Sequence, residues 1–315
     1  MSQTGIAVVI VSWNSRADLE TCLASLAAQT DRDFETIVVD NGSTDGSLEM
    51  LKSSYPWAHA IDTGDNLGFA EGCNRGIEAS RSEWIAMLNA DTEADARWIE
   101  TLRAAARTAH DDIGMLQSRL VLRQHRDRTN STGVLLFADG SAEDRDFDRP
   151  VRDDDREEEV FCAPAGAALY RRAMLDRIAL STGVFDRTFF MYYEDVDLGW
   201  RARVAGWGAL YVPGAVVAHE FQGSSRRRES HFIGMHLKRN RLRMLLKNGS
   251  LSFFVRALPK TVYDLGEAML WLGPRAMLEL GRAARDGLRG RREVSKAAAM
   301  RRRDVERRWV VRRPR

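Results

Sequence analysis

Short apolar runs alternate with helical patterns over residues 6–89. The run IAVVIV at residues 6–11 is rich in β-branched side chains and lacks polar alternation, which is typical of a parallel strand covered on both faces. Apolar residues with helical spacing follow at residues 19–26, and ETIVVD at residues 35–40 predicts a second strand. Further predicted elements are a strand at residues 59–61, a helix at 70–79 and a strand at 84–88. This order predicts an α/β fold with a Rossmann-like, mostly parallel central sheet and helices on both faces.

After residue 109 the pattern changes to shorter strand-like pieces between polar turns, at residues 115–122 and 133–137. Residues 139–159 contain 11 acidic and 4 basic side chains and almost no apolar ones, so we predict a mobile surface loop that does not pack. Regular structure is expected again at residues 160–170 and in a strand at residues 207–212.

The last part of the chain has the pattern of helices that mix basic and apolar positions. Two amphipathic segments, residues 251–258 and 262–272, are separated by Pro259. We therefore divide the chain into an α/β domain at residues 1–230 and a helical, basic C-terminal extension at residues 231–315.

The formal net charge of +2 hides a strong asymmetry along the chain. Residues 282–315 carry 14 Lys and Arg against 4 acidic residues, a net charge of +10, which leaves −8 for the rest of the chain. Such a basic end could bind nucleic acid, form an inert solvated tail or hold anionic lipid head groups. Because amphipathic segments precede it, we favour the inner face of an anionic membrane as the partner and expect no nucleic acid.

Three cysteines, Cys22, Cys73 and Cys162, lie far apart without CxxC spacing. This argues against a disulfide framework and suits a reducing compartment, for which the cytosol is the default. The N-terminus lacks the basic start and long apolar stretch of a signal peptide, and no window reaches about 18 uncharged apolar residues. We therefore expect a cytoplasmic protein that is peripheral on the inner face of the plasma membrane.

Polar or small residues follow each of the four predicted strands of the parallel sheet. These four turns are Ser12-Trp13-Asn14, Asp40-Asn41-Gly42-Ser43, Asp65-Asn66-Leu67-Gly68 and Asn89-Ala90-Asp91. In open α/β sheets, ligands bind outside the carboxyl ends of the strands, so a binding site is expected here. Asx, Ser and Gly are also ordinary turn and helix-cap residues, but four such turns at one edge favour a ligand site.

Asp91, a later acidic pair and His219 are the candidates for chemistry. Asp91 ends the fourth strand, where it could manage a hard cation or phosphate, or merely cap the next helix. Glu194 and Asp195 follow the aromatic run FFMYY, whose desolvation would raise the proton affinity of a general base; the alternative is a solvated acidic first turn. His219 would add a nitrogen donor beside Asp91, as manganese accepts, although a lone histidine is more often structural.

In combination, these residues resemble the family 2 glycosyltransferases, the inverting enzymes of the GT-A fold, and among them the bacterial rhamnosyltransferase-like branch. The resemblance covers residues 6–248. Its motifs are VVIVSWN (residues 8–14), VVDNGSTDGS (38–47), DNLGFAEGCNRGI (65–77), LNADTE (88–93), YYEDVDLGWRAR (192–203) and VVAHEFQGSS (216–225). Together, in this order, they make a chance match negligible.

The resemblance implies a nucleotide-sugar site at the edge of the sheet. The residues that it assigns to this site are Ser12, Asn14, Asp40, Asn41, Asn66, Gly68, Phe69, Asn74, Asn89 and Asp91. Asp91 corresponds to the last residue of the family's Asp-x-Asp motif, which binds Mg²⁺ or Mn²⁺, and His219 matches a position that ligates the metal in some members. Asp195 would be the catalytic base, with Glu194 as its partner in the Glu-Asp pair.

The implied activity is an inverting, metal-dependent glycosyl transfer in bacterial cell-surface glycan synthesis. The favoured donor is dTDP-L-rhamnose, and the acceptor is a polysaccharide or a polyprenyl-diphosphate-linked glycan. The alternatives are a UDP-hexose or galactofuranose donor, or a catalytically silent scaffold that only binds the nucleotide sugar. Two departures from the family's pattern leave the scaffold as an alternative. Asn89 replaces the first acidic residue of Asp-x-Asp, and Asn41 stands where many members carry a second Asp. A homodimer is left open as the oligomeric state.

Overall fold

A computed structural model describes residues 5–152, 156–220 and 230–313, so residues 221–225 of the VVAHEFQGSS motif lie outside the described residues. The helices are α1 (Arg16–Ala27), α2 (Ser47–Ser54), α3 (Phe69–Ala79), α4 (Trp98–Thr108), α5 (Arg172–Ile178), α6 (Glu194–Val204), α7 (Ser230–Asn248), α8 (Leu251–Leu272), α9 (Arg275–Ala297) and α10 (Arg302–Trp309), with a 3₁₀ turn, η1 (Arg187–Phe189). The strands are β1 (Ile6–Ser12), β2 (Phe34–Asp40), β3 (His59–Asp62), β4 (Trp84–Asn89), β5 (Thr92–Ala94), β6 (Ile113–Leu122), β7 (His125–Ser131), β8 (Val134–Phe137), β9 (Ala142–Asp144), β10 (Glu158–Glu159), β11 (Ala167–Arg171), β12 (Gly208–His219) and β13 (Val310–Val311).

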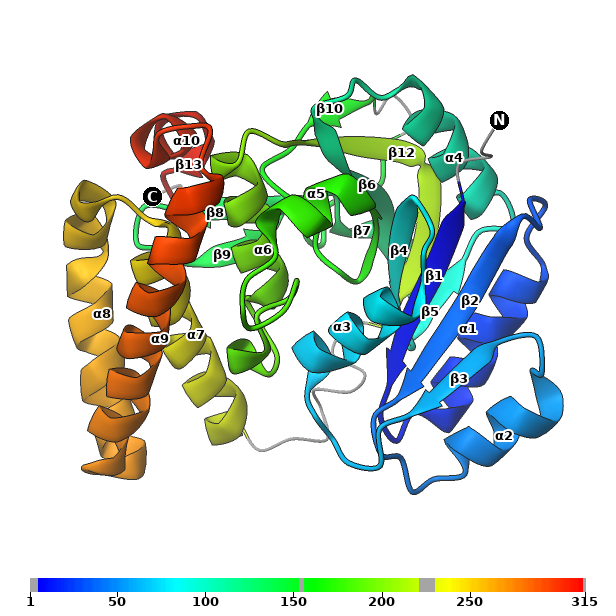
Figure 1. Cartoon of the computed structure of the whole chain (residues 1–315), viewed down its shortest axis with the longest axis horizontal. Helices are drawn as coiled ribbons and strands as arrows, with labels where there is room; N and C mark the ends of the chain where they lie inside the picture. Colours follow the sequence, from blue (N-terminus) through cyan, green and yellow to red (C-terminus); the bar gives the residue numbers. More distant parts are fainter. Residues whose placement is uncertain (1–4, 153–155, 221–229, 314–315) are drawn as a thin grey trace.

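The main sheet has the strand order β10-β12-β6-β11-β4-β1-β2-β3, with β5 on β12 and β7 on β6 (Figure 1). Strand β1 pairs in parallel with β2 and β4, and β2 pairs in parallel with β3. Strand β11 is antiparallel to both β4 and β6, whereas β12 runs parallel to β6. The mostly parallel α/β sheet predicted from the sequence is therefore confirmed; β11 is a reversed strand inside it, and β5, β7 and β10 also pair antiparallel.

Both faces of β1 are buried, which explains why its sequence shows no polar alternation. Val8 and Ile10 pack into a core shared with α1, α2 and α4, whereas Ala7 and Val9 pack into a second core shared with α3, α5 and α6. Helix α3 lies very close to the sheet because it presents glycine there: a Cβ at Gly76 would lie 2.2 Å from a methyl carbon of Val9. The two helical layers fix the carboxyl edge of the parallel strands, where the polar turns emerge.

The acidic stretch at residues 139–159 is better ordered than the sequence predicts. Its residues 142–144 form β9, which pairs with β8, so the prediction of a loop that does not pack is wrong there. Arg145 pairs with Glu158 at 2.7 Å, which ties two parts of the stretch together. The like charges that argue against packing are thus partly neutralised within the stretch itself. Residues 153–155 lie outside the described residues.

Helix α8 runs without a break through Pro259, which the sequence suggests as a separator of two segments. Pro259 lacks an N–H group for the carbonyl of Val255, one turn earlier. Both residues are exposed on the outer side of α8, where water can satisfy that carbonyl. Packing of the opposite side of α8 therefore outweighs the local preference of proline.

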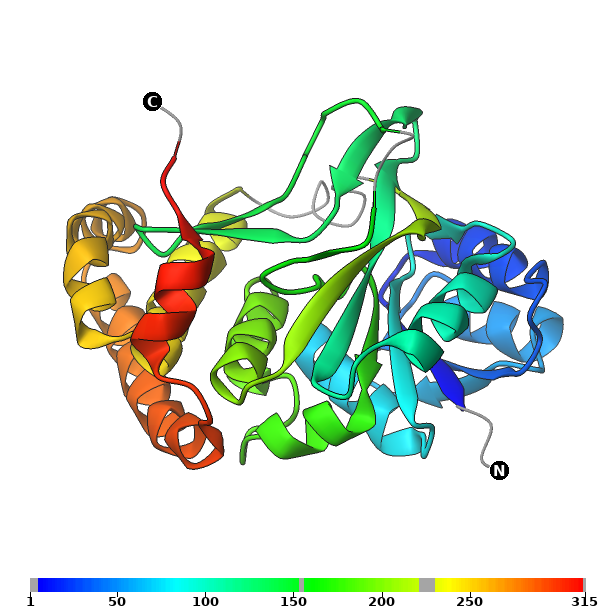
Figure 2. The ribbon, with the colours of Figure 1, turned by 90° about the horizontal axis from the view of Figure 1, so that it is seen from above.

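Helices α7, α8 and α9 form a separate layer beside α6, shown in yellow to orange in Figure 2. The end of the chain then returns to the α/β part, where Val310 and Val311 of β13 pair in parallel with Leu136 and Phe137 of β8. Within the described residues, no helix is long and apolar enough to cross a bilayer. All three cysteines are free and buried, as expected for a chain without a disulfide framework.

Candidate active site

The turns after β1 and β2 meet at the carboxyl edge of the sheet. Asp40 is 1% exposed, and its Oδ1 accepts a hydrogen bond from the backbone N–H of Ser43 at 2.8 Å. Its Oδ2 is buried and has no partner among the described residues, so it is an acceptor that a ligand N–H could satisfy. Ser12 is buried and bonded to Ser15, and Asn14 accepts from the N–H of Thr44 at 2.8 Å.

Asn41 braces the glycine-rich loop before α3. Its Nδ2 donates to Gly68 O at 3.1 Å and to Asn66 Oδ1 at 3.2 Å, and its Oδ1 accepts from the N–H of Leu67 at 3.1 Å. Asn66 Oδ1 also accepts from the N–H of Gly68 at 3.0 Å. Both polar groups of Asn41 and the side-chain oxygen of Asn66 are therefore engaged within the loop, so Asn41 shapes the loop that precedes α3.

The loop and α3 are fastened to the segment that precedes α6. Asn74 is 3% exposed and bonds both ways to the backbone of Phe185, donating to its carbonyl at 2.8 Å and accepting from its N–H at 2.9 Å. Ala70, next to Phe69 at the start of α3, donates its N–H to Phe190 O at 3.1 Å. Gly68, with φ of +87°, leaves room for Phe190, because a Cβ there would lie 2.4 Å from its ring. Asn74 thus acts as a tether in the structure, and its amide is already engaged.

The structure brings both Asp91 and Asn89 into contact with His219. Asn89 and His219 are 130 residues apart in the chain. Asp91 Oδ1 lies 3.3 Å from His219 Nε2, and Asn89 Nδ2 lies 3.4 Å from the same nitrogen. Strand β5 makes this contact possible, because it pairs with β12 and sets Thr92 opposite His219. His219 Nδ1 bonds to Asn130 Oδ1 of β7 at 2.6 Å, which fixes the orientation of the ring. No sequence motif points to Asn130.

Asp91 and His219 suit a divalent cation that takes its other ligands from a substrate. Mg²⁺ and Mn²⁺ accept carboxylate oxygens, and Mg²⁺ is often held by one or two carboxylates plus phosphate oxygens and water. Among the described residues, no group of three or more His, Cys, Asp and Glu could enclose a metal ion. Burial lowers the pKa of His219, but the hydrogen bond and charge of Asp91, together with the charges of Asp144 and Glu220, raise it, so the net shift is upward. The residues fit a cation that binds together with a diphosphate.

Asp195 and Glu194 begin α6 but differ in accessibility. Asp195 is partly exposed, and it accepts from the N–H groups of Ala165 at 3.2 Å and Val196 at 2.7 Å. Burial raises the pKa of Asp195 above its usual value, although these backbone hydrogen bonds lower it. Glu194 is 5% exposed; burial and then the charge of Asp195 raise its pKa well above the usual value. Asp195 is therefore the carboxylate that a substrate can reach, and Glu194 is the one whose surroundings favour the protonated form.

Strand β9 adds an acidic residue that sequence reasoning missed. Burial raises the pKa of Asp144 to about 6; the Ser131 hydroxyl lowers it, the charge of Asp195 raises it, and His219 lowers it. Asp144 therefore lies within electrostatic reach of both the acidic pair and the Asp91–His219 contact. The sequence placed it in a loop, and only the pairing of β9 with β8 brings it to the site.

A family model for glycosyl transferase family 2 matches residues 7–179, more than half of the chain. The chain belongs to glycosyltransferase family 2. It is 30% identical over 253 residues to the N-acetylglucosaminyl-diphospho-decaprenol L-rhamnosyltransferase of Mycobacterium tuberculosis (strain ATCC 25618 / H37Rv), covering 73% of this chain and 81% of the relative.

Solved structures show the fold of this glycosyltransferase. The mannosyltransferase PcManGT from Pyrobaculum calidifontis, in complex with GDP-Man and Mn²⁺, aligns with a TM-score of 0.55 at 18% identity, over 96% of this chain and 87% of that chain. GalNAc-T7 with UDP, GalNAc and Mn²⁺ aligns with a TM-score of 0.62 at 15% identity, over 90% of this chain and 54% of that chain. The GT-A fold predicted from the motifs is therefore confirmed.

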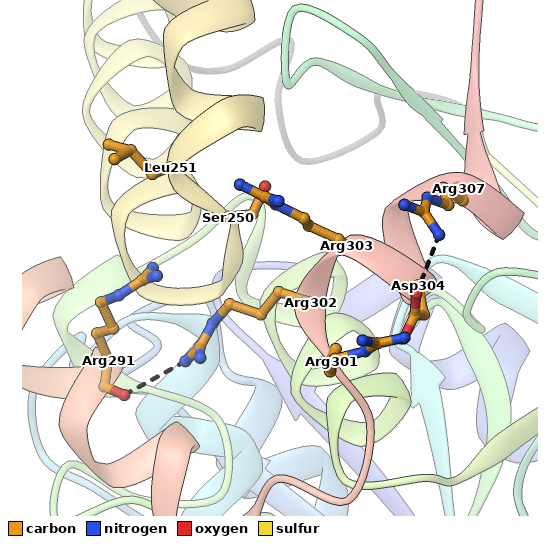
Figure 3. Close-up of a pocket in the computed structure, with 8 residues that line it drawn as sticks. All are labelled: Ser250, Leu251, Arg291, Arg301, Arg302, Arg303, Asp304 and Arg307. Atoms are coloured by element: carbon orange, nitrogen blue, oxygen red, sulfur yellow. Dashed lines mark hydrogen bonds and ion pairs between the residues drawn. The ribbon is translucent and has the colours of Figure 1, made fainter.

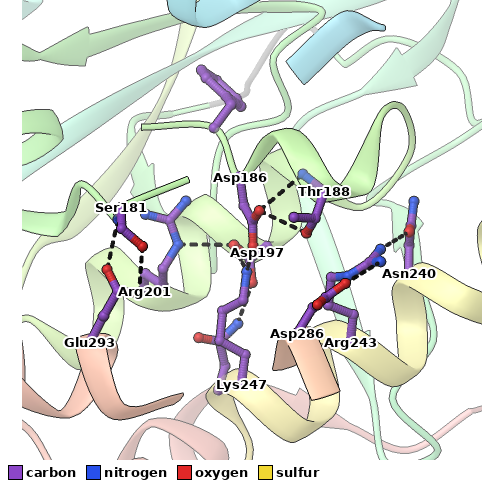
Figure 4. A network of polar contacts seen from close by, with 12 residues as sticks. Ser181, Asp186, Thr188, Asp197, Arg201, Asn240, Arg243, Lys247, Asp286 and Glu293 are labelled. Atoms are coloured by element: carbon purple, nitrogen blue, oxygen red, sulfur yellow. Dashed lines mark hydrogen bonds and ion pairs between the residues drawn. The ribbon is translucent and has the colours of Figure 1, made fainter. Parts of the chain in front are cut away.

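Asp197, the third carboxylate of the Glu-Asp-Val-Asp segment of this glycosyltransferase, lies in a buried network of polar contacts. Asp197 is fully buried and accepts from Arg201 Nε at 2.9 Å, Lys247 Nζ at 3.1 Å and Asn248 Nδ2 at 2.8 Å. Lys247, at the end of α7, also bonds to Asp186 (Figure 4). These contacts fasten α7 to α6, the helix that carries Asp195.

Helix α7 also holds the turn in front of Asp195. The non-glycine residues Phe190, Tyr192 and Tyr193 all have positive φ, of +67°, +67° and +68°, a conformation that costs about 1–3 kcal/mol each and persists only where the surroundings impose it. Asn240 of α7 is fully buried, and its Nδ2 donates to the carbonyl oxygens of residues 189, 191 and 192 at 2.9, 2.8 and 2.9 Å. The sequence has no signal for this contact, because α7 lies far along the chain.

We expect Asn240→Ala to lower kcat about tenfold while donor affinity stays within about twofold, because the turn relaxes and Asp195 loses its orientation. Steady-state kinetics and calorimetric donor titration measure the two effects. Asn240→Asp is the matched variant: it keeps the size of the side chain but loses the N–H donors, so its kcat should fall to a similar degree. An unchanged kcat in folded Asn240→Ala would show that the turn holds its shape without this contact.

Proposed function

We propose that this family 2 glycosyltransferase transfers L-rhamnose from dTDP-L-rhamnose, with inversion, onto a lipid-linked glycan acceptor in bacterial cell-surface polysaccharide synthesis. The observation that carries the proposal is the contact of Asp91 with His219, together with the partly exposed carboxylate of Asp195, whose charge, like that of His219, acts on Asp144. The choice of sugar is supported by the relative from Mycobacterium tuberculosis, which is named as an L-rhamnosyltransferase.

The donor would lie along the carboxyl edge of the parallel strands. The free Oδ2 of Asp40 can accept a hydrogen bond from an N–H of the nucleotide base. The loop braced by Asn41 would form the wall of the pocket, with Gly68 and Phe69 at the start of α3. Asn74 would act through the backbone of Phe185 and have no direct contact with the donor.

Asp91 and His219 would hold a divalent cation, Mg²⁺ or Mn²⁺, against the donor diphosphate. When bound, the cation neutralises the negative charge that develops on the leaving diphosphate. Asn130 keeps the His219 ring in place through Nδ1, so that Nε2 points to Asp91. Asn89 supplies an amide where many family members have a carboxylate, which removes one negative donor from the site and predicts weaker cation binding.

Asp195 would take the proton from the acceptor hydroxyl. As the proton moves to the carboxylate, the acceptor oxygen forms a bond to the anomeric carbon, and the bond to the diphosphate oxygen on the opposite face breaks. A single displacement of this kind inverts the anomeric configuration. The raised pKa of Asp195, caused by burial, makes its carboxylate a stronger base than an aspartate in water.

The acceptor would be a polyprenyl-diphosphate-linked glycan at the inner face of the plasma membrane. The Mycobacterium tuberculosis relative carries such an acceptor in its name, N-acetylglucosaminyl-diphospho-decaprenol. One observation favours a second function, a silent nucleotide-sugar scaffold: Asn89 stands in place of the first acidic residue of the Asp-x-Asp motif. A UDP-hexose or a galactofuranose donor is the alternative within the same activity.

A panel of nucleotide sugars tests the proposal. We expect dTDP-L-rhamnose to be hydrolysed slowly in the presence of Mn²⁺, and to be transferred when a lipid-diphosphate acceptor is added, because Asp195 can activate either nucleophile. Hydrolysis of a UDP-sugar instead would change the assigned donor. Binding without hydrolysis or transfer would favour the scaffold.

A pair of matched variants tests the cation site. In Asp91→Ala, the gain in donor affinity that Mn²⁺ provides should fall at least about 100-fold, as measured by calorimetric titration. In Glu93→Ala, which removes a nearby carboxylate paired with Arg126 on the surface, the gain should be unchanged. Equal Mn²⁺ dependence in Asp91→Ala and the wild type would remove Asp91 from the metal site.

A further inference from the structure

The outer side of α8 is an apolar stripe that no other described part of the chain covers. Its members recur at helical spacing, and their exposed fractions are 73% for Leu251, 58% for Val255, 43% for Leu258, 60% for Val262 and 37% for Met269. Figure 1 shows α8 at the outer edge of the molecule, with α7 and α9 on its inner side. Exposed apolar patches of this extent on a soluble protein mark an interaction surface.

Four of the five acidic residues of α8 and α9 pair with basic residues of α7, and the fifth, Glu293, accepts hydrogen bonds from Ser181. Four ion pairs join these helices: Asp264 with Arg241 at 2.8 Å, Glu267 with Lys238 at 2.9 Å, Glu279 with Arg239 at 3.4 Å and Asp286 with Arg243 at 3.4 Å. Neither acidic residue of α8 therefore lies on the apolar stripe. The basic excess of the C-terminal part is left facing outward.

A basic pocket of about 420 Å³ opens at the start of α8 (Figure 3). It is lined by Ser250, Leu251, Asp304 and five arginines, which are Arg291, Arg301, Arg302, Arg303 and Arg307. Asp304 pairs with Arg301 at 2.7 Å and with Arg307 at 3.5 Å, so it offsets only part of the charge. Arg303 is exposed, reaches from α10 toward Ser250 in Figure 3, and has no partner among the described residues.

We propose that the α8 stripe and the arginine pocket form one surface that docks on an anionic phospholipid bilayer. The two parts are continuous because Leu251 begins the stripe and also lines the pocket. In this arrangement the apolar side chains enter the interfacial region and the arginines bind lipid phosphates. The inference rests on the proposed function insofar as a lipid-linked acceptor requires the enzyme at a membrane.

Charge favours a bilayer over a second copy of the chain on this surface. The partner must supply negative charge to the arginines, and the same surface of a second copy would present arginines and apolar residues. An anionic bilayer supplies phosphates beside an apolar interior, which matches both halves of the surface.

Flotation of the full chain with vesicles tests the docking surface. We expect the wild type to float with vesicles that contain phosphatidylglycerol, to remain unbound with pure phosphatidylcholine vesicles, and to detach as salt is raised. Arg303→Gln should weaken binding about fivefold, because one charge is lost near the surface. Val255→Gln combined with Val262→Gln should weaken it at least about tenfold, because two half-exposed apolar groups no longer enter the interface.

Matched controls separate the surface from general effects of charge and hydrophobicity. Arg81→Gln and Trp57→Gln change an exposed arginine and an exposed aromatic residue of the α/β part, and both should bind vesicles like the wild type. Donor hydrolysis in solution is measured for every variant and should be unchanged. Loss of flotation with intact hydrolysis therefore concerns docking alone, whereas absent hydrolysis in the wild type concerns the proposed function.

Three results would overturn the docking surface. The first is equal binding of the wild type to neutral and anionic vesicles. The second is weakening by Arg303→Gln without weakening by the double valine variant, which would indicate a site for a soluble anion, to be checked by titration with inorganic diphosphate. The third is a dimer in light scattering that the double valine variant converts to a monomer, which would place a second copy on the stripe.

Discussion

Asp195→Asn is expected to lower kcat at least about 100-fold while donor affinity stays within about twofold of the wild type. The amide cannot take the proton from the acceptor hydroxyl, but its single oxygen can still accept one of the two N–H groups that the carboxylate accepts, from Ala165 at 3.2 Å or from Val196 at 2.7 Å. The fold of the loop should therefore survive. Initial-rate kinetics with saturating acceptor, together with calorimetric titration of the donor, measure the two quantities.

Glu194→Gln is the matched control, because the neighbouring carboxyl is changed in the same way. Burial and the charge of Asp195 raise the pKa of Glu194 well above its usual value, so glutamine replaces the carboxyl whose protonated form its surroundings favour. We expect its kcat within about tenfold of the wild type. Near wild-type turnover in Asp195→Asn would show that another group is the base.

The pH profile gives an independent reading of the same base. A general base acts only when deprotonated, so kcat/KM should fall as the pH drops through the pKa of Asp195. Since burial raises that pKa, the acidic limb of the wild-type profile should lie above the usual aspartate value of 3.8. The residual activity of Asp195→Asn should lack this limb.

Lys247→Met should lower the free energy of unfolding by about 3–5 kcal/mol, the usual cost of breaking a buried ion pair from one side. Lys247 and Asp197 are fully buried, and Lys247 lies between Asp186 and Asp197. Methionine fills a similar volume but leaves the carboxylate of Asp186 with only the N–H and hydroxyl of Thr188. Urea unfolding followed by tryptophan fluorescence measures the loss.

The pH dependence of this loss has a definite sign. Burial raises the pKa of Asp186, but Lys247 and the Thr188 hydrogen bonds lower it further, so the net shift is downward. Its contribution to stability is therefore complete above the usual aspartate pKa of 3.8 and declines as the pH falls below it. The difference between the wild type and Lys247→Met should shrink below that pH. Lys52→Met, at an exposed position of α2, should leave stability within about 0.5 kcal/mol; a similarly small loss in Lys247→Met would show that the buried network does not fasten α7.

Local sequence determined the elements and the edge of the sheet that carries the site. The β-branched run of β1, the spacing of Leu19, Leu23 and Leu26, and the polar turns after the strands depend on neighbours within a few residues. Such patterns reflect periodic burial, which a strand or helix expresses along its own length. The motifs that resemble family 2 glycosyltransferases are also short stretches of consecutive residues, so the family and the GT-A fold could be predicted.

Only the tertiary structure decided which polar groups meet and which are buried. Asp91 meets His219 through the pairing of β5 with β12, and Asn130 joins them from β7. Asn240 reaches the turn before Asp195 from a helix far along the chain. Burial also distinguishes Glu194 from Asp195, two adjacent residues of similar chemistry, because the side chain of Glu194 is buried and that of Asp195 is partly exposed. Contacts between distant segments and the dielectric around each group follow from the packing of the whole chain, and no local pattern encodes them.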